Sequence, residues 1–172
     1  LAWPERASLQ VGLDIMLFVL AVMGGRVIPM FTNNGIPGVQ ATRHPLVERV
    51  SLGSVLLLLA ADVLPTPASV LATIALLAGL THAVRLCLWQ PWRTLATPLV
   101  WVLHAAYAWI VVYLVLRALG AFGLVAEPLA THALTIGAIP IVVDPVDERL
   151  ALARSLGVTH TVNPAGADAV AA

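Results

Sequence analysis

Residues 68–89 read Ala68-Ser-Val-Leu-Ala-Thr-Ile-Ala-Leu-Leu-Ala-Gly-Leu-Thr-His82-Ala-Val-Arg85-Leu-Cys-Leu-Trp89. This stretch is apolar over most of its length, and its imidazole and guanidinium side chains are confined to its last third. A helix of roughly 20 apolar residues is long enough to cross the ~30 Å hydrocarbon layer of a bilayer. The stretch therefore predicts a membrane-spanning helix, with the lipid bilayer as its expected partner.

Three further segments have the same character. Residues 9–31, 46–64 and 97–119 are similarly long and apolar, and a fifth segment starts near residue 122 or 124. Hydrophobic residues make up 60% of the chain and charged residues 10%, against about 45–50% and 25% in soluble proteins. We therefore predict an all-α membrane protein with four to five transmembrane helices. The net charge of zero gives no indication of a nucleic-acid partner.

The last part of the chain has a different character. Residues 139–143 and 159–162 are short β-branched runs with a helical pattern between them. The sequence Asp144-Pro-Val-Asp-Glu-Arg149 between these runs would be very costly in the centre of a bilayer. We therefore predict two domains. Residues 1–138 form a transmembrane helical bundle, and residues 139–172 form a strand–helix–strand tail of α/β type.

Several ionisable side chains lie inside the predicted spans. Because successive spans run in opposite directions, the first and third end at the membrane face where the second and fourth begin. His82 lies seven residues before the end of its span and His104 seven after the start of its own, about 10 Å below that face. His132, in the fifth segment, is expected toward the opposite face. We expect one polar layer near the first face, formed by Arg26, His82, Arg85 and His104.

Two interpretations of this layer remain open. Ionisable residues within spans are costly and usually functional, and two neutral imidazoles at matched depth suit axial ligation of haem iron or binding of copper. Alternatively, His82 and His104 form hydrogen bonds between helices. Arg26 and Arg85 either pair with haem propionates or extend to the lipid headgroups. Gly24-Gly25 is expected to permit close contact between helices.

Arginines in the loops give a weak prediction of orientation. By the positive-inside rule, Arg43, Arg49 and Arg93 place their loops in the cytoplasm. Arg6 and Arg117 oppose this orientation, because they lie toward the other face. The sequence therefore leaves the orientation open.

Four blocks of sequence follow one another in a specific order along the predicted bundle. They are Gly24-Gly-Arg-Val-Ile-Pro-Met-Phe-Thr-Asn-Asn34, His82-Ala-Val-Arg-Leu-Cys-Leu-Trp89, Pro98-Leu-Val-Trp-Val-Leu-His104-Ala-Ala-Tyr-Ala-Trp109 and Thr131-His132-Ala-Leu-Thr-Ile-Gly-Ala138. Their order and spacing resemble those of the NnrS family. Members of that family are polytopic bacterial membrane proteins that contain haem and copper and take part in the response to nitric oxide.

The resemblance implies a location in the bacterial inner (cytoplasmic) membrane and a role in the nitric oxide response or denitrification. It implies haem and copper as cofactors, nitric oxide or another small diatomic molecule as a ligand, and His82, His104 and His132 as metal ligands. It does not say which metal each histidine binds. The family has about twelve spans, so the chain is expected to be a middle portion with an incomplete ligand set. No complete catalytic site is expected, and whether the chain takes part in an enzyme stays open.

The tail resembles another family. Residues 137–164 read Gly137-Ala-Ile-Pro-Ile-Val-Val-Asp144-Pro-Val-Asp-Glu-Arg149-Leu-Ala-Leu-Ala-Arg-Ser-Leu-Gly-Val-Thr-His-Thr-Val-Asn-Pro164, similar to part of the Rossmann domain of medium-chain zinc-dependent alcohol dehydrogenases. In that family an acid at the position of Asp144 binds the ribose of NAD, and a basic residue at that of Arg149 lies beside it. Because the chain lacks the Gly-x-Gly-x-x-Gly turn and a Cys/His zinc set, we expect no NAD binding.

Three hypotheses follow for the whole chain. The first is a portion of an NnrS-like haem and copper protein that carries a short foreign tail. The second is a membrane-tethered, NAD-dependent alcohol dehydrogenase-like fusion. The third is a non-functional chimeric product, joined at a Gly-Ala pair that both families supply.

Overall fold

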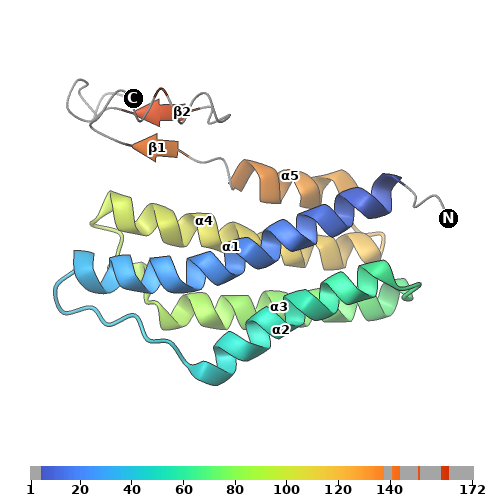
Figure 1. Ribbon diagram of the computed structural model, residues 1–172, viewed down its shortest axis with the longest axis horizontal. Helices are drawn as coiled ribbons and strands as arrows, with labels where there is room; N and C mark the ends of the chain where they lie inside the picture. The colour runs from blue at the N-terminus through green and yellow to red at the C-terminus, as the bar shows by residue number, and fades with distance from the viewer. Residues whose placement is uncertain (1–4, 138–140, 144–150, 152–159, 163–172) are drawn as a thin grey trace. The chain divides into compact units, whose positions relative to one another are not determined.

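The computed structural model describes residues 5–137, 141–143, 151 and 160–162, and the chain divides into two compact units, residues 1–134 and 135–172. The described part of the chain contains four long helices, a shorter fifth and two strands (Figure 1). The helices are α1 (Glu5–Gly35), α2 (Pro45–Val63), α3 (Ala68–Leu88), α4 (Pro98–Ala121) and α5 (Glu127–Gly137), with a single 3-10 turn, η1 (Pro91–Arg93). The predicted all-α architecture of the bundle is confirmed.

Proline residues set several of the helix boundaries. Pro45 and Pro98 stand at the first positions of α2 and α4, where the missing amide hydrogen costs no intrahelical bond. Pro67 directly precedes α3. The turn between α3 and α4 contains Gln90 in the left-handed conformation, with φ of 56°. These boundaries keep the connections short, so α2, α3 and α4 run in alternating directions.

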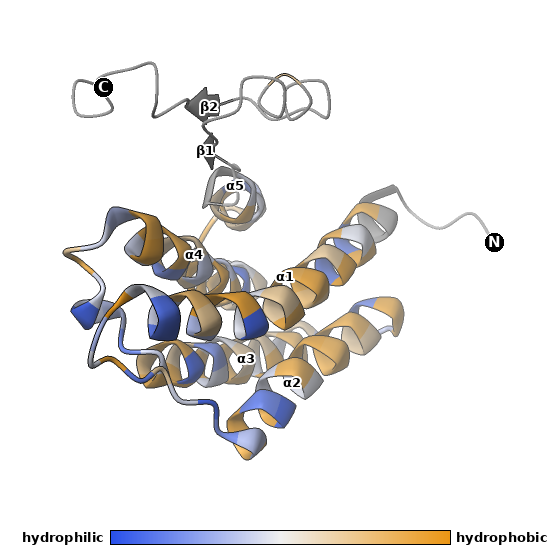
Figure 2. Ribbon diagram, turned by 60° about the vertical axis from the view of Figure 1, so that its left-hand side comes forward, coloured by the Kyte–Doolittle hydropathy of each residue, from blue (hydrophilic) through white to orange (hydrophobic). Residues whose placement is uncertain are grey.

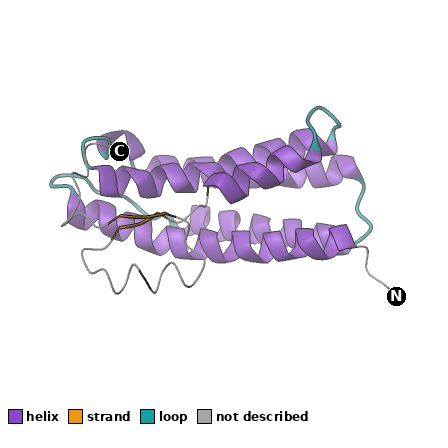
Figure 3. Cartoon of the chain, turned by 90° about the horizontal axis from the view of Figure 1, so that it is seen from above, coloured by secondary structure: helices purple, strands orange, loops and turns teal. Residues whose placement is uncertain are grey.

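Helices α1 to α4 pack as a bundle in which α3 contacts α2 and α4, and α1 also contacts α2 and α4. Figure 3 shows the long helices side by side, with their connections at the two ends. Small residues at helical spacing form the first part of the buried face of α3, and His82 and Arg85 continue it: the small residues are Ala72, Ala75, Ala78 and Gly79. Small residues allow helix backbones to approach closely, which matters most where lipid replaces water around the helices.

The outer surface of this bundle is strongly apolar. Figure 2 shows hydrophobic residues along most of the length of α1 to α4, and many large apolar side chains are exposed. Among the described helices, the stretches Leu9–Gly35, Ala68–Arg93 and Pro98–Ala121 are long and apolar enough to cross a membrane. Helix α2 forms where a fourth span is predicted, but it carries Glu48, Arg49 and Asp62. Glu48 is paired with Arg85, and Asp62 with Arg117, inside the bundle.

In the second unit, the strands β1 (Ile141–Val143) and β2 (His160–Val162) pair in parallel, with Ile141 opposite His160. Both strands lie within the β-branched runs of the sequence. The helix predicted between them falls almost wholly outside the described residues, as do Asp144 and Arg149. The domain boundary after residue 138 stays a prediction.

Candidate functional site

Buried polar side chains gather toward both ends of the helical bundle. At the end where α1 and α3 finish and α2 and α4 begin, four residues form a connected group that we call the His82 chain: Glu48, His82, Arg85 and Tyr107. At the other end, three residues form a group that we call the Arg117 cluster: Asp14, Asp62 and Arg117. His104 and Arg117 lie thirteen residues apart on α4, which corresponds to about 20 Å.

Arg85 is the centre of the His82 chain. Its Nε and Nη2 donate to the two carboxylate oxygens of Glu48 at 2.7 and 2.5 Å, and its Nη1 donates to the carbonyl of Ala21 at 2.8 Å. A Cβ atom at Gly25 would lie 1.7 Å from Nη2, so only glycine leaves room for this guanidinium. The predicted role of Gly24-Gly25 in close helix contact is thereby confirmed.

Proton positions in the His82 chain follow from its partners. His82 is fully buried, and its Nε2 lies 3.2 Å from the carbonyl of Ser51. A carbonyl can only accept, so Nε2 carries the ring proton and Nδ1 is the acceptor. Nδ1 lies 2.6 Å from the hydroxyl of Tyr107, which itself accepts from Arg85 Nη1 at 2.8 Å. Hydrogen bonds therefore run in one direction from Arg85 through Tyr107 and His82 to Ser51.

His104 is buried one turn before Tyr107 on α4 and has a different environment. Its Nδ1 lies 3.0 Å from the carbonyl of Val100, so Nδ1 carries the proton and Nε2 has the lone pair. Nε2 lies 3.4 Å from the hydroxyl of Thr32, but that hydroxyl donates to the carbonyl of Ile28 at 2.8 Å. The lone pair of His104 Nε2 thus faces an oxygen whose proton is directed elsewhere.

Two other predicted site residues, Arg26 and His132, lie at the surface. Arg26 is exposed on α1, apart from the buried side chains of His82, Arg85 and His104. His132 is exposed on α5, and its Nδ1 lies 2.6 Å from the carbonyl of Pro128. The structure therefore places three of the four residues of the predicted layer inside the bundle.

The donor set can be compared with what haem or copper requires. Metal-ligating histidines usually donate one ring N–H to a carbonyl or carboxylate and bind the metal through the other nitrogen. His104 has this arrangement, whereas both ring nitrogens of His82 are engaged by neighbours. Arg85 is bound by Glu48, so pairing with a propionate would require that carboxylate to move. No group of three His, Cys, Asp or Glu side chains within the described residues is arranged to hold a metal. The described residues therefore fit one imidazole ligand rather than a complete metal site.

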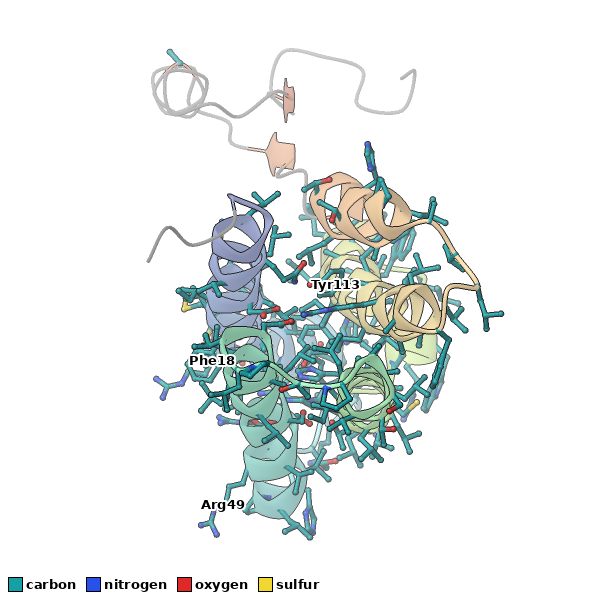
Figure 4. All side chains as sticks on the ribbon, turned by 90° about the vertical axis from the view of Figure 1, so that its right-hand side faces the viewer. Phe18, Arg49 and Tyr113 are labelled. Carbon is teal, nitrogen blue, oxygen red and sulfur yellow. The ribbon has the colours of Figure 1, made fainter. Side chains whose placement is uncertain are left out.

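The Arg117 cluster was not anticipated from the sequence. Arg117 Nη1 donates to Asp14 Oδ1 at 2.6 Å, and Nη2 is paired with Asp62. Gln10 donates to Asp14 Oδ1 at 3.3 Å and to the hydroxyl of Tyr113 at 2.9 Å. Figure 4 shows Tyr113 inside the bundle, near the polar side chains of this end. Three helices therefore meet at one guanidinium.

A cavity of about 910 Å³ adjoins the Arg117 cluster. Its polar wall contains Gln10, Asp62, Tyr113, Arg117, Thr131 and His132, and leucines supply much of the remainder. Asp62 keeps 12% of its side-chain surface exposed, whereas Asp14 is completely buried. The cavity thus gives the cluster a route to the outside through Asp62.

A helical bundle with an apolar outer surface and buried interhelical ion pairs defines a membrane protein of α-helical type. Within that class, the family model described as NnrS protein matches residues 1–165, and the chain belongs to the NnrS family. The match extends beyond the predicted domain boundary at residue 138.

A second similarity involves a soluble enzyme family. A stretch of 73 residues is 44% identical to an uncharacterized zinc-type alcohol dehydrogenase-like protein of Haemophilus influenzae. The stretch covers 41% of this chain and 20% of that protein, so the chain spans about a fifth of the length of the curated relative it matches. No solved structure matches the chain. Both resemblances seen in the sequence are confirmed.

Proposed function

We propose that the chain forms a cofactor-binding bundle of a haem- and copper-containing protein in the bacterial inner membrane, linked to the nitric oxide response or denitrification. In this proposal His104 supplies an imidazole ligand to haem iron or copper. When bound, such a metal would supply the coordination position for nitric oxide or another small diatomic molecule. We assign no catalytic residue.

The observation that carries this proposal is the lone pair of His104 Nε2. The Val100 carbonyl fixes the ring proton on Nδ1, and the Thr32 hydroxyl is directed toward Ile28. A buried acceptor without a donor is costly, and coordination to a metal would remove that cost. The ring is also already oriented by its backbone partner, as a ligand histidine requires.

His82 has a different role in this proposal. Its ring links Tyr107 of α4 to the Ser51 carbonyl of α2, and Tyr107 lies three residues after His104. His82 therefore positions α4, and with it the ring of His104. His132 and Arg26 remain candidates for a cofactor site on the strength of the sequence alone.

Absorption spectra of membranes from cells that produce the chain test the proposal. We expect a haem Soret band that is lost or shifted in His104→Ala. The control is His44→Ala, because His44 is exposed in the connection between α1 and α2. His82→Ala should broaden or weaken the band without abolishing it, because the ligand remains but its helix is less well held.

Other outcomes would count against the assignment. An unchanged Soret band in His104→Ala would remove His104 as a haem ligand. Copper analysis of the same purified variants separates the two metals, because loss of copper with an unchanged Soret band would assign His104 to copper. Retention of both metals in His104→Ala would overturn the proposal.

A second proposal concerns the tail, and the similarity of 73 residues of the chain to the dehydrogenase-like protein supports it. We propose that residues 139–172 derive from a dinucleotide-binding domain and do not bind NAD. Titration of the purified chain with NAD, followed by calorimetry, should give no binding heat, and saturable binding would revive the dehydrogenase-like alternative. Long-read sequencing across the codons for residues 130–150 tests whether the join belongs to the genome or to a chimeric product.

A further inference from the structure

The Arg117 cluster contains more acid than base. Asp14 comes from α1, Asp62 from α2 and Arg117 from α4, and one guanidinium binds both carboxylates. If both acids were ionised, the group would carry a net charge of −1 inside a helical membrane bundle. Such an uncompensated charge is expensive in a low-dielectric interior. Binding of one positive charge would therefore stabilise the cluster.

The arrangement of the carboxylates indicates which positive charge fits. Asp14 Oδ1 accepts from Arg117 and Gln10, but Asp14 Oδ2 is fully buried and has no hydrogen-bond partner among the residues that the structure describes. Arg117 is paired with Asp14 through Nη1 and with Asp62 through Nη2, so the two carboxylates lie beside each other on one guanidinium. Two ionised carboxylates are both acceptors, so a hydrogen bond between them requires one proton. Pairs of close carboxylates that share one proton are well established in other proteins.

We propose that Asp14 and Asp62 hold one proton between them, and that the Arg117 cluster is a proton-binding site that exchanges with water through the adjoining cavity. A hydronium ion in the cavity gives its proton to one carboxylate oxygen: one O–H bond of hydronium breaks as the carboxyl O–H bond forms, which leaves water, and release to water in the cavity is the reverse of this step. Asp62 is the entry group because it is partly exposed, and Asp14 is the inner group. This inference is independent of metal binding by His104, about 20 Å away along α4.

Each helix around the cluster contributes to its surroundings. Helix α1 places Gln10 beside Asp14, and α4 places Tyr113 beside both Gln10 and Arg117. Helix α3 contributes the apolar Leu71 to the cavity, and α5 contributes His132. In the described part of the bundle, Arg117 is ion-paired with both carboxylates, and His132 is a second titratable side chain that lines the same cavity.

Infrared spectroscopy of the full chain in lipid vesicles tests this proposal at neutral pH. We expect the carbonyl stretching band of a protonated carboxyl group in the wild type, and we expect it to shift when water is replaced by D₂O. Asp14→Asn and Asp62→Asn should each abolish the band, because the remaining carboxylate and Arg117 then form a neutral pair. The matched control is Glu48→Gln, which removes the carboxylate of a balanced pair with Arg85 and should leave the band unchanged.

The wild-type spectrum alone can overturn the proposal, so the test does not depend on how well a variant folds. Absence of the band would exclude a stored proton, whichever cation then occupies the cluster. A band that survives both asparagine substitutions would come from another carboxyl group. A band that does not shift in D₂O would exclude exchange through the cavity.

Discussion

The two ends of the helical bundle contain the same kinds of buried polar residue, an arginine, a tyrosine and an acid, but in different numbers. At each end an arginine lies over a tyrosine ring of α4, with 5.8 Å from Arg85 Cζ to the centroid of Tyr107 and 6.0 Å from Arg117 Cζ to that of Tyr113. At each end the guanidinium also binds an acid from α2. The difference is that Arg117 binds a second acid, Asp14, which comes from α1.

This difference separates a site with balanced charges from one with an excess of acid. In the His82 chain, one acid matches one base, and the hydrogen bonds pass through His82 to a backbone carbonyl. Its charges are balanced, so it can hold three helices together beside His104 without any ligand. In the Arg117 cluster, one carboxylate oxygen has no donor among the residues that the structure describes, and the two acids outnumber the single arginine. An excess of negative charge allows the Arg117 cluster to bind a cation or a proton, whereas the balanced charges of the His82 chain only stabilise the bundle.

The largest effect is expected when either arginine is removed. Arg85→Ala leaves the Glu48 carboxylate without its partner, and breaking a buried ion pair in this way costs about 3–5 kcal/mol. Arg117→Ala should cost a similar amount if the two acids share a proton, because one net negative charge then remains at each end. The free energy of unfolding in mixed micelles, followed by circular dichroism, measures both.

The control for these substitutions is Arg49→Ala. Arg49 is exposed on α2 and extends away from the bundle in Figure 4, so its removal should leave the unfolding free energy unchanged. A loss in Arg117→Ala that is much greater than in Arg85→Ala would indicate two ionised acids and no shared proton.

A smaller loss is expected when the space for Arg85 is reduced. Gly25→Ala places a Cβ 1.7 Å from Arg85 Nη2, so the guanidinium has to move away from Glu48. Overpacking of this kind costs about 3 kcal/mol at the upper end of its usual range. Gly53→Ala on α2 is the matched control, because a Cβ there meets nothing within 4 Å. Equal stability of both variants would contradict the tight fit of Arg85.

The helices could be predicted because the thickness of a bilayer sets the minimum length of the apolar run that each spanning helix needs. Apolar runs ended by proline or glycine predicted α2, α3 and α4 to within two residues at each end. Helix α1 is longer than predicted, beginning at Glu5 and ending at Gly35. Its extra turns lie beyond the apolar run, where hydrophobic length gives no information.

The depth of the site residues along the bundle axis could be predicted from the sequence, but whether each side chain faces into or out of the bundle could not. Residue spacing placed His82, Arg85 and His104 at one level, but it could not show that Arg26 faces outward, because that depends on how α1 is rotated against its neighbours. The Arg117 cluster was missed because Arg117 was considered only as an exception to the positive-inside rule. The same depth argument, applied to the opposite end, would have placed Asp14 and Asp62 near Arg117.

The tyrosine hydroxyls should differ in importance. Tyr107→Phe removes the group that connects Arg85 to His82 and leaves Nδ1 of the buried imidazole without a donor, which should cost about 2 kcal/mol. Tyr113→Phe should cost less, because its hydroxyl only accepts, from Gln10 at 2.9 Å and Arg117 at 3.3 Å. Unfolding measurements on the two variants make the comparison, and equal losses would indicate that the hydroxyl of Tyr107 has no special connecting role.

The smallest effect is expected for Asp62→Asn, and it gives the sharpest comparison between the two ends. If Asp14 and Asp62 share a proton, the asparagine amide can donate to Asp14 much as the protonated carboxyl does, so the unfolding free energy should change by less than about 1 kcal/mol. Glu48→Gln at the other end leaves Arg85 with no counter-ion and should cost several times more. Equal and large losses would mean that both carboxylates are needed as charges. The Arg117 cluster would then be a structural ion pair like that of Glu48 and Arg85, and the distinction between the two ends would fail.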